Sequence, residues 1–187
     1  MADLLHYLQR SREAVLRGLD GMSEYDARRP VVPSGNNVLG LVKHLATMEF
    51  EYLGSCVGRP VDPPVQWVAD GSIDRSADTW AAPEETREEI VALYRRAWAH
   101  SAASLAALPY DAPAHVHWWP QGRQTTTLGH LLARMVDETA RHAGHVDLMR
   151  ELVDGRTDYG AFEGDELSAY VAEVTAAAEP FRPEPSS

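Results

Sequence analysis

Four long segments of this chain carry apolar residues three and four positions apart, and this spacing constrains the fold more than any other feature. In the last segment, Leu128, Leu131, Leu132 and Met135 begin an apolar stripe that continues to Leu152. Such a stripe places apolar side chains on one face of an α-helix and leaves the opposite face to solvent. The pattern therefore predicts an all-α protein, a four-helix bundle whose helices pack their stripes together.

Each segment begins after a residue that suits a helix N-terminus and ends at a residue that breaks helices. The predicted starts are, in chain order, Asp3, Asn36 or Asn37, Pro83, and Thr126 or Thr127. The predicted ends are near Gly21, Gly58, Pro109 and Gly155.

Two long connections separate the predicted helices. Residues 60–82 and 109–124 show no sustained periodicity, so we expect them to cross the surface. A weaker helix is expected over 165–178, and the proline-rich tail 180–187 is expected to be disordered. The length fits one domain, which we place at 1–179.

Charge and cysteine content restrict the partners and the compartment. The formal net charge is -11, with 28 acidic against 17 basic residues, so the surface should repel phosphate backbones and anionic membranes. No stretch reaches the roughly 18 apolar residues of a membrane span. Cys56 is the only cysteine, and we expect it to be a buried, inert thiol. We therefore expect a cytoplasmic protein that acts on small molecules, without nucleic-acid or membrane partners.

One pair of residues predicts chemistry. Glu138 and His142 stand four positions apart, which places both side chains on one face of the last long helix. His44, among apolar neighbours on the second helix, is the candidate third ligand. Two imidazoles and a carboxylate suit zinc and leave a coordination position open, although nickel, manganese, iron and cobalt accept the same donors.

Other interpretations of these residues stay open. His44 alone fits a core histidine that donates to a backbone carbonyl. Glu138 could instead pair with Arg134, one turn earlier. His145 lies seven residues after Glu138, near the same azimuth, and could replace His142 as the ligand. We prefer His142 because ligands one turn apart reach one ion more easily.

An unusual run of aromatic and histidine residues lies in the second connection, at 115–119. We expect Trp118 and Trp119 to form a pocket wall for a substrate or cosubstrate. The sequence contains no glycine-rich phosphate loop, no nucleophile elbow and no zinc-protease helix. The remaining interpretations are a metal-dependent activity or no enzymatic activity.

Segments 39–46 and 137–151 resemble the two metal-bearing helices of the DinB-like superfamily. The spacing of Glu138 and His142 is similar to the mycothiol-dependent branch, which includes maleylpyruvate isomerases and thiol S-transferases. The resemblance covers roughly residues 1–160 and implies a four-helix bundle, a homodimer and a divalent ion held by His44, Glu138 and His142. Relatives often carry a histidine where Arg134 stands, and we take Arg134 as a candidate substrate-side residue.

Our first functional hypothesis is a metal-dependent enzyme that uses a low-molecular-weight thiol such as mycothiol or bacillithiol. A metal-bound thiolate would then serve an S-transferase or isomerase reaction. Two alternatives are a hydrolase that uses metal-bound water and a non-catalytic metal-containing binding or stress-response module.

Overall fold

The computed structural model describes residues 2–157 and 162–183. Within these residues the regular secondary structure is helical apart from one small antiparallel sheet, which confirms the predicted all-α class. The elements, in chain order, are α1 (Ala2–Arg17), α2 (Glu24–Arg28), α3 (Val38–Tyr52), the 3-10 helix η1 (Ser55–Val57), α4 (Gln66–Ala69), the 3-10 helix η2 (Ser72–Arg75), α5 (Arg87–Ala107), β1 (Pro113–His115), β2 (Thr125–Thr127), α6 (Leu128–Asp154), α7 (Gly164–Ala178) and the 3-10 helix η3 (Glu179–Phe181).

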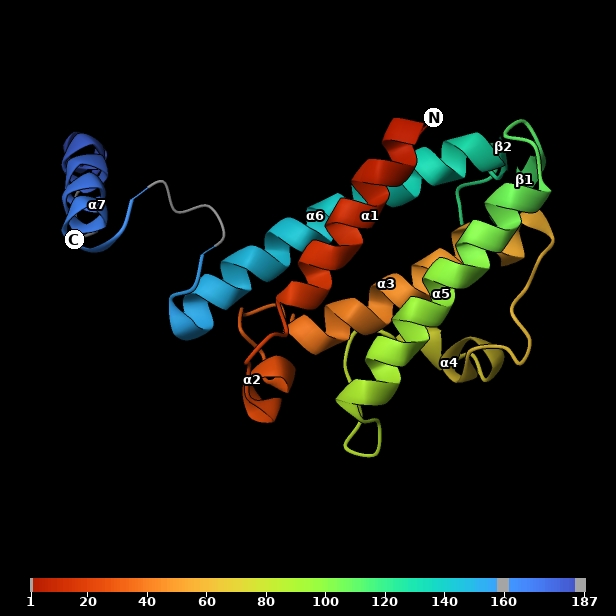
Figure 1. Cartoon of the computed structure of the whole chain (residues 1–187), viewed down its shortest axis with the longest axis horizontal. Coiled ribbons are helices and arrows are strands. Elements are labelled where there is room, and N and C mark those ends of the chain that lie inside the picture. The colour runs from red at the N-terminus through yellow and green to blue at the C-terminus, as the bar shows by residue number, and fades with distance from the viewer. Residues whose placement is uncertain (1, 158–161, 184–187) are drawn as a thin grey trace. The chain divides into compact units, whose positions relative to one another are not determined.

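The four long helices α1, α3, α5 and α6 form the predicted bundle. Helix α1 packs against α6, α6 against α3, and α3 against α5, as Figure 1 shows. Their apolar stripes meet in two adjoining clusters, one centred on α3 and one on the first half of α6. Each fully buried leucine or phenylalanine side chain in them contributes about 1.5–3 kcal/mol. The fully buried large side chains include Leu8, Leu39, Leu45, Phe50, Leu131 and Leu132.

A buried ion pair, together with a hydrogen bond to its carboxylate, links three of these helices across the core. Glu49 of α3 is fully buried and pairs with Arg12 of α1, while the Ser101 hydroxyl of α5 donates to Glu49 Oε1 over 2.7 Å. Burial raises the pKa of Glu49, against the opposing effect of Arg12. Because an unpaired buried carboxylate is costly, this contact favours one mutual arrangement of α1, α3 and α5.

Capping residues decide where the helices begin. Asn37, not Asn36, caps α3, because its Oδ1 accepts from the Gly40 amide at 2.8 Å. Thr127 caps α6 in the same way, and Gly155 ends that helix with a left-handed backbone. Asp3 lies within the first turn of α1 and does not precede it.

The predicted start of the third helix at Pro83 is wrong. Helix α5 begins at Arg87, because Thr86 and Glu89 form a capping box in which each side chain accepts from the other residue's backbone amide. This reciprocal pair satisfies two amides that would otherwise lack partners at the helix start.

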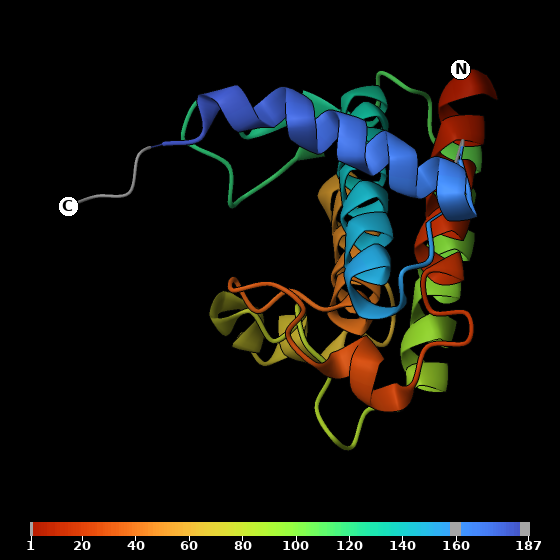
Figure 2. The ribbon, with the colours of Figure 1, turned by 90° about the vertical axis from the view of Figure 1, so that its left-hand side faces the viewer.

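Both long connections contain more local structure than their sequences predict. Residues 60–82 include α4 and η2. The second connection contains β1 and leads to β2, and the two strands form a hairpin in which Ala114 pairs with Thr126. Ala112, Ala114 and Val116 are buried in the second apolar cluster. The hairpin therefore closes one end of the bundle, and Figures 1 and 2 place α2 at the opposite end.

The chain divides into two compact units, residues 1–155 and 156–187. The second unit contains α7, which confirms the expected weaker helix. Residues 158–161 and 184–187, the latter part of the expected disordered tail, lie outside the described residues, so the tail and the domain boundary at 179 stay predictions. In the described residues, no helix combines the length and apolar character that crossing a membrane would demand.

Candidate metal centre

Three side chains from two facing helices meet at one point in the bundle. Helix α3 supplies His44, and α6 supplies Glu138 and His142. Glu138 Oε1 lies 3.5 Å from His44 Nε2 and 3.2 Å from His142 Nε2. The two imidazole rings stand edge to face with centroids 5.2 Å apart. The structure thus brings together the three residues that the sequence analysis selected.

The distances between these atoms suit a common ion. Ligands about 2.0–2.2 Å from one tetrahedral ion stand roughly 3.4 Å from one another. The three donor atoms all lie within 4.8 Å of one another. The side chains of His44, Glu138 and His142 keep 19%, 12% and 15% of their surface exposed, so the cluster is partly open to solvent. The donor set therefore fits a divalent ion with one side accessible to small molecules.

Asp78 contacts the ring nitrogen of His44 that does not face Glu138. Its Oδ2 lies 2.7 Å from His44 Nδ1, and the aspartate is buried. An imidazole that donates its Nδ1 proton to a carboxylate keeps the Nε2 lone pair free for a ligand. Sequence reasoning missed Asp78, because it lies in the aperiodic 60–82 connection, where only the length of the loop indicated function.

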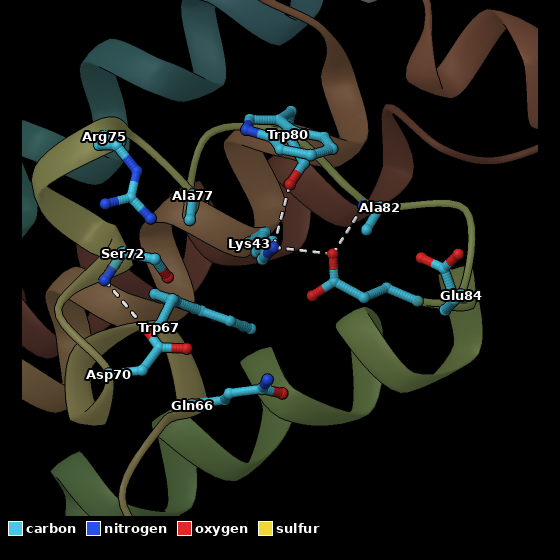
Figure 3. A pocket seen from close by; sticks show the side chains of 11 residues that line it. Lys43, Gln66, Trp67, Asp70, Ser72, Arg75, Ala77, Trp80, Ala82 and Glu84 are labelled. Atoms are coloured by element: carbon cyan, nitrogen blue, oxygen red, sulfur yellow. Dashed lines mark hydrogen bonds and ion pairs between the residues drawn. The ribbon is translucent and has the colours of Figure 1, made fainter.

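Lys43 fixes the segment that carries Asp78. Its ammonium donates to the Trp80 carbonyl over 3.0 Å, as Figure 3 shows, and to Glu85 Oε2 over 2.8 Å. It also lies 4.1 Å from the centroid of the Trp67 ring. These contacts hold both sides of the connection against α3, so the position of Asp78 beside His44 depends on them.

His145 occupies a supporting position in this geometry. Its Nδ1 lies 3.3 Å from Nδ1 of His142, on the opposite side of that ring from Glu138. The cluster of donor atoms contains His142 and not His145. His145 can therefore accept the Nδ1 proton of His142, as Asp78 does for His44.

Arg134 is held by acidic neighbours on its own helix. Its guanidinium lies 2.7 Å from Glu138 Oε2 and 2.8 Å from Asp137 Oδ2, and it lies near the Tyr52 side chain. One oxygen of Glu138 thus faces the imidazoles while the other faces Arg134. The salt bridge that was the alternative to metal binding is present, and it coexists with the three-residue cluster.

The charges around the cluster shift two ionisation equilibria. Burial disfavours the charged form of His44, but hydrogen bonds with Asp78 and Glu138 outweigh this and raise its pKa to about 9. Hydrogen bonds from His142 and His44, with the charge of Arg134, hold the pKa of Glu138 well below its usual range. Without an ion, a proton on His44 therefore supplies the positive charge that the carboxylates favour.

The two tryptophans of the second connection take different positions. Trp118 lines a cavity of about 410 Å³ together with Met48, one turn beyond His44 on α3. Trp119 is not among the residues that line it, and its Nε1 donates to the Tyr52 hydroxyl over 3.3 Å. Trp118 therefore belongs to a pocket wall, while Trp119 supports Tyr52.

Fold and site together define a class of protein, a DinB-like helical bundle with a histidine–glutamate–histidine cluster between two helices. One solved structure, that of a conserved protein from Enterococcus faecalis, has a TM-score of 0.61 at 16% identity, covering 81% of this chain and 95% of that one, and supports the fold. No curated protein is similar enough to match. The chain belongs to the mycothiol-S-transferase family, whose model matches residues 3–155. This confirms the resemblance found in the sequence.

Proposed function

We propose that this chain is a metal-dependent S-transferase that joins the sulfur of mycothiol, or of a related small thiol, to an electrophilic carbon. The observation that carries the proposal is the meeting of two imidazole nitrogens and one carboxylate oxygen at distances of 3.2 and 3.5 Å. Zinc is the first candidate ion for this donor set. The family match supports the thiol as cosubstrate.

The side chains of the site have separate tasks in this proposal. A divalent ion held by His44, Glu138 and His142 would supply the positive charge that favours a deprotonated thiol at neutral pH. Asp78 and His145 orient the two imidazoles, and Arg134 fixes the second oxygen of Glu138. In the transfer, the thiol proton passes to solvent, a sulfur–carbon bond forms, and the leaving group departs with its bonding electrons.

The proposal is tested by metal content and thiol turnover measured on the same preparations. We expect about one ion per chain after dialysis, and faster conjugation of mycothiol to a small neutral electrophile than in a metal-stripped sample. Glu138→Gln keeps the shape of the side chain but removes its charge, so it should lower both metal content and turnover.

His6→Ala is the matched control, because His6 is an exposed histidine of α1. It should leave both measurements unchanged. Full metal retention in both Glu138→Gln and His44→Ala would contradict the ligand assignment. Turnover that does not require a thiol would instead favour hydrolysis.

A further inference from the structure

A cavity opens beside the candidate metal centre, along the same face of α3. Met48 and Glu51 follow His44 by four and seven residues, so their side chains lie on the face of α3 that carries His44. At 1.5 Å of rise per residue they stand about 6 and 10 Å further along the helix axis. The two long connections supply the remaining walls, through η2 and through Trp118. This position suits the part of an electrophile that does not react.

The walls of this cavity are largely apolar. Met48, Val68, Ile73 and the indole of Trp118 line its volume of about 410 Å³. Trp118 keeps 40% of its surface exposed and contacts Tyr52, with ring centroids 5.4 Å apart. An exposed indole face beside aliphatic side chains favours an apolar group and attracts a cation through its π-electrons.

The ionisable side chains that line the cavity are mostly acidic. Its lining residues include two carboxylates, Glu51 and Asp74, and one imidazole, His117, but no lysine or arginine among those that the structure describes. Arg134, which lies near Tyr52, is already paired with Glu138 and with a second carboxylate. A carboxylate on the substrate would therefore meet like charge without a counterion.

Glu51 is the carboxylate most affected by its surroundings. The residue is 9% exposed, and the Ser55 hydroxyl donates a hydrogen bond to its Oε1 over 3.1 Å. Burial raises the pKa of Glu51, and the bond from Ser55 and the nearby His117 only partly oppose this. Because a buried carboxylate gains from a nearby cation, a positively charged ligand group would be favoured here.

Building on the proposed function, we infer that this cavity binds the non-reacting part of the electrophile and selects an apolar, positively charged group over a carboxylate. An apolar ammonium fits both properties of the cavity, the indole with its aliphatic walls and the uncompensated carboxylates. A neutral apolar group fits only the first property. A dicarboxylate substrate fits neither, so the chain should favour S-transfer to cationic or neutral apolar electrophiles.

The test uses three unreactive probes of similar shape and different charge: para-tert-butylbenzyl alcohol, its para-trimethylammonium isostere and its para-carboxylate analogue. Their dissociation constants are measured by calorimetry on zinc-loaded full-length protein without thiol. We expect the ammonium probe to bind roughly fivefold more tightly than the tert-butyl probe, and the carboxylate probe to bind more weakly than both.

Glu51→Gln should remove most of the preference for the ammonium probe, because it keeps the shape and the acceptor for Ser55 but loses the charge. Glu88→Gln, at an exposed position of α5, is the matched control and should leave the preference unchanged. If Glu51→Gln does not fold, Asp74→Asn at the exposed rim replaces it and should reduce the preference.

Equal binding of all three probes, tightest binding of the carboxylate, no measurable binding, or an unchanged preference in the folded variant would overturn the inference. These results leave the thiol assay with a small neutral electrophile untouched, so the cavity assignment can fail while S-transfer stands. Loss of thiol turnover with an intact probe preference would instead contradict the proposed function.

Discussion

Asp78 is the residue whose contact most directly controls a ligand of the candidate metal centre. It holds Nδ1 of His44 at 2.7 Å, which leaves Nε2 directed at Glu138. We expect Asp78→Asn to weaken metal affinity about 10- to 100-fold, because an amide fixes the ring and its proton less well than a carboxylate does. Competition with a chromogenic chelator measures the change.

The control for that substitution is Asp111→Asn, an exposed aspartate in the second connection. It removes the same charge from the chain without touching His44. Equal metal affinity in Asp78→Asn and the unmodified protein would show that the His44 ring does not need the carboxylate.

Cys56 offers a separate prediction at this scale. Burial, with the nearby charge of Glu51, raises the pKa of its thiol from 9.0 to about 12. The protonated thiol is thus favoured by the folded state, so its contribution to stability is complete below pH 9 and is lost as the pH rises toward 12. We expect slow reaction with an aromatic disulfide reagent at about pH 8 in the native protein and fast reaction in denaturant. Rapid native labelling would contradict the assignment.

The candidate ligands could be selected from the sequence because two of them share one helix. Glu138 and His142 are neighbours wherever residues 128–154 are helical, so local periodicity is sufficient. His44 could be selected as the third candidate because it lies among the apolar residues of a second predicted helix. Asp78 could not be found in this way, since its place follows from tertiary contacts of an aperiodic connection.

At the scale of elements, the two adjacent asparagines at the start of α3 allow a test of which one caps the helix. Asn37 is buried and accepts from the Gly40 amide, whereas Asn36 is exposed. Asn37→Ala should lower the free energy of unfolding by about 1 kcal/mol through loss of the cap. Asn36→Ala, the matched control, should stay within about 0.5 kcal/mol. Urea denaturation measures both, and equal effects would show that the cap contributes nothing.

The elements differ in how far their sequences determine them. Apolar stripes predicted the four long helices, because burial of a stripe is what stabilises a helix in a protein. The start of α5 was misplaced, because Pro83 and a full capping box at Thr86 are both good signals and only one can begin the helix. The strands of the hairpin are three residues each, too short for alternation to be visible.

At the scale of the whole molecule, the boundary after Gly155 separates a complete bundle from the rest of the chain. Both apolar clusters lie within residues 1–155, and the family match ends at the same residue. We therefore expect a fragment of residues 1–155 to fold with an unchanged thermal midpoint and to retain its metal. Circular dichroism and elemental analysis check this. Loss of cooperative unfolding would show instead that the bundle requires residues beyond 155, as the predicted domain limit of 179 supposes.

Lys43 and His44 are consecutive, yet each holds a different stretch of one connection. The lysine contacts Trp67, Trp80 and Glu85, and the histidine contacts Asp78. In the sequence, Asp78 lies between the two tryptophans that the lysine contacts. The position of this loop and the position of the His44 ring in the candidate metal centre are consequently coupled. We therefore expect a single peptide-bond cut near residue 70 to weaken metal binding at the candidate centre, although it removes none of the three candidate ligands; the metal content of the nicked protein measures this.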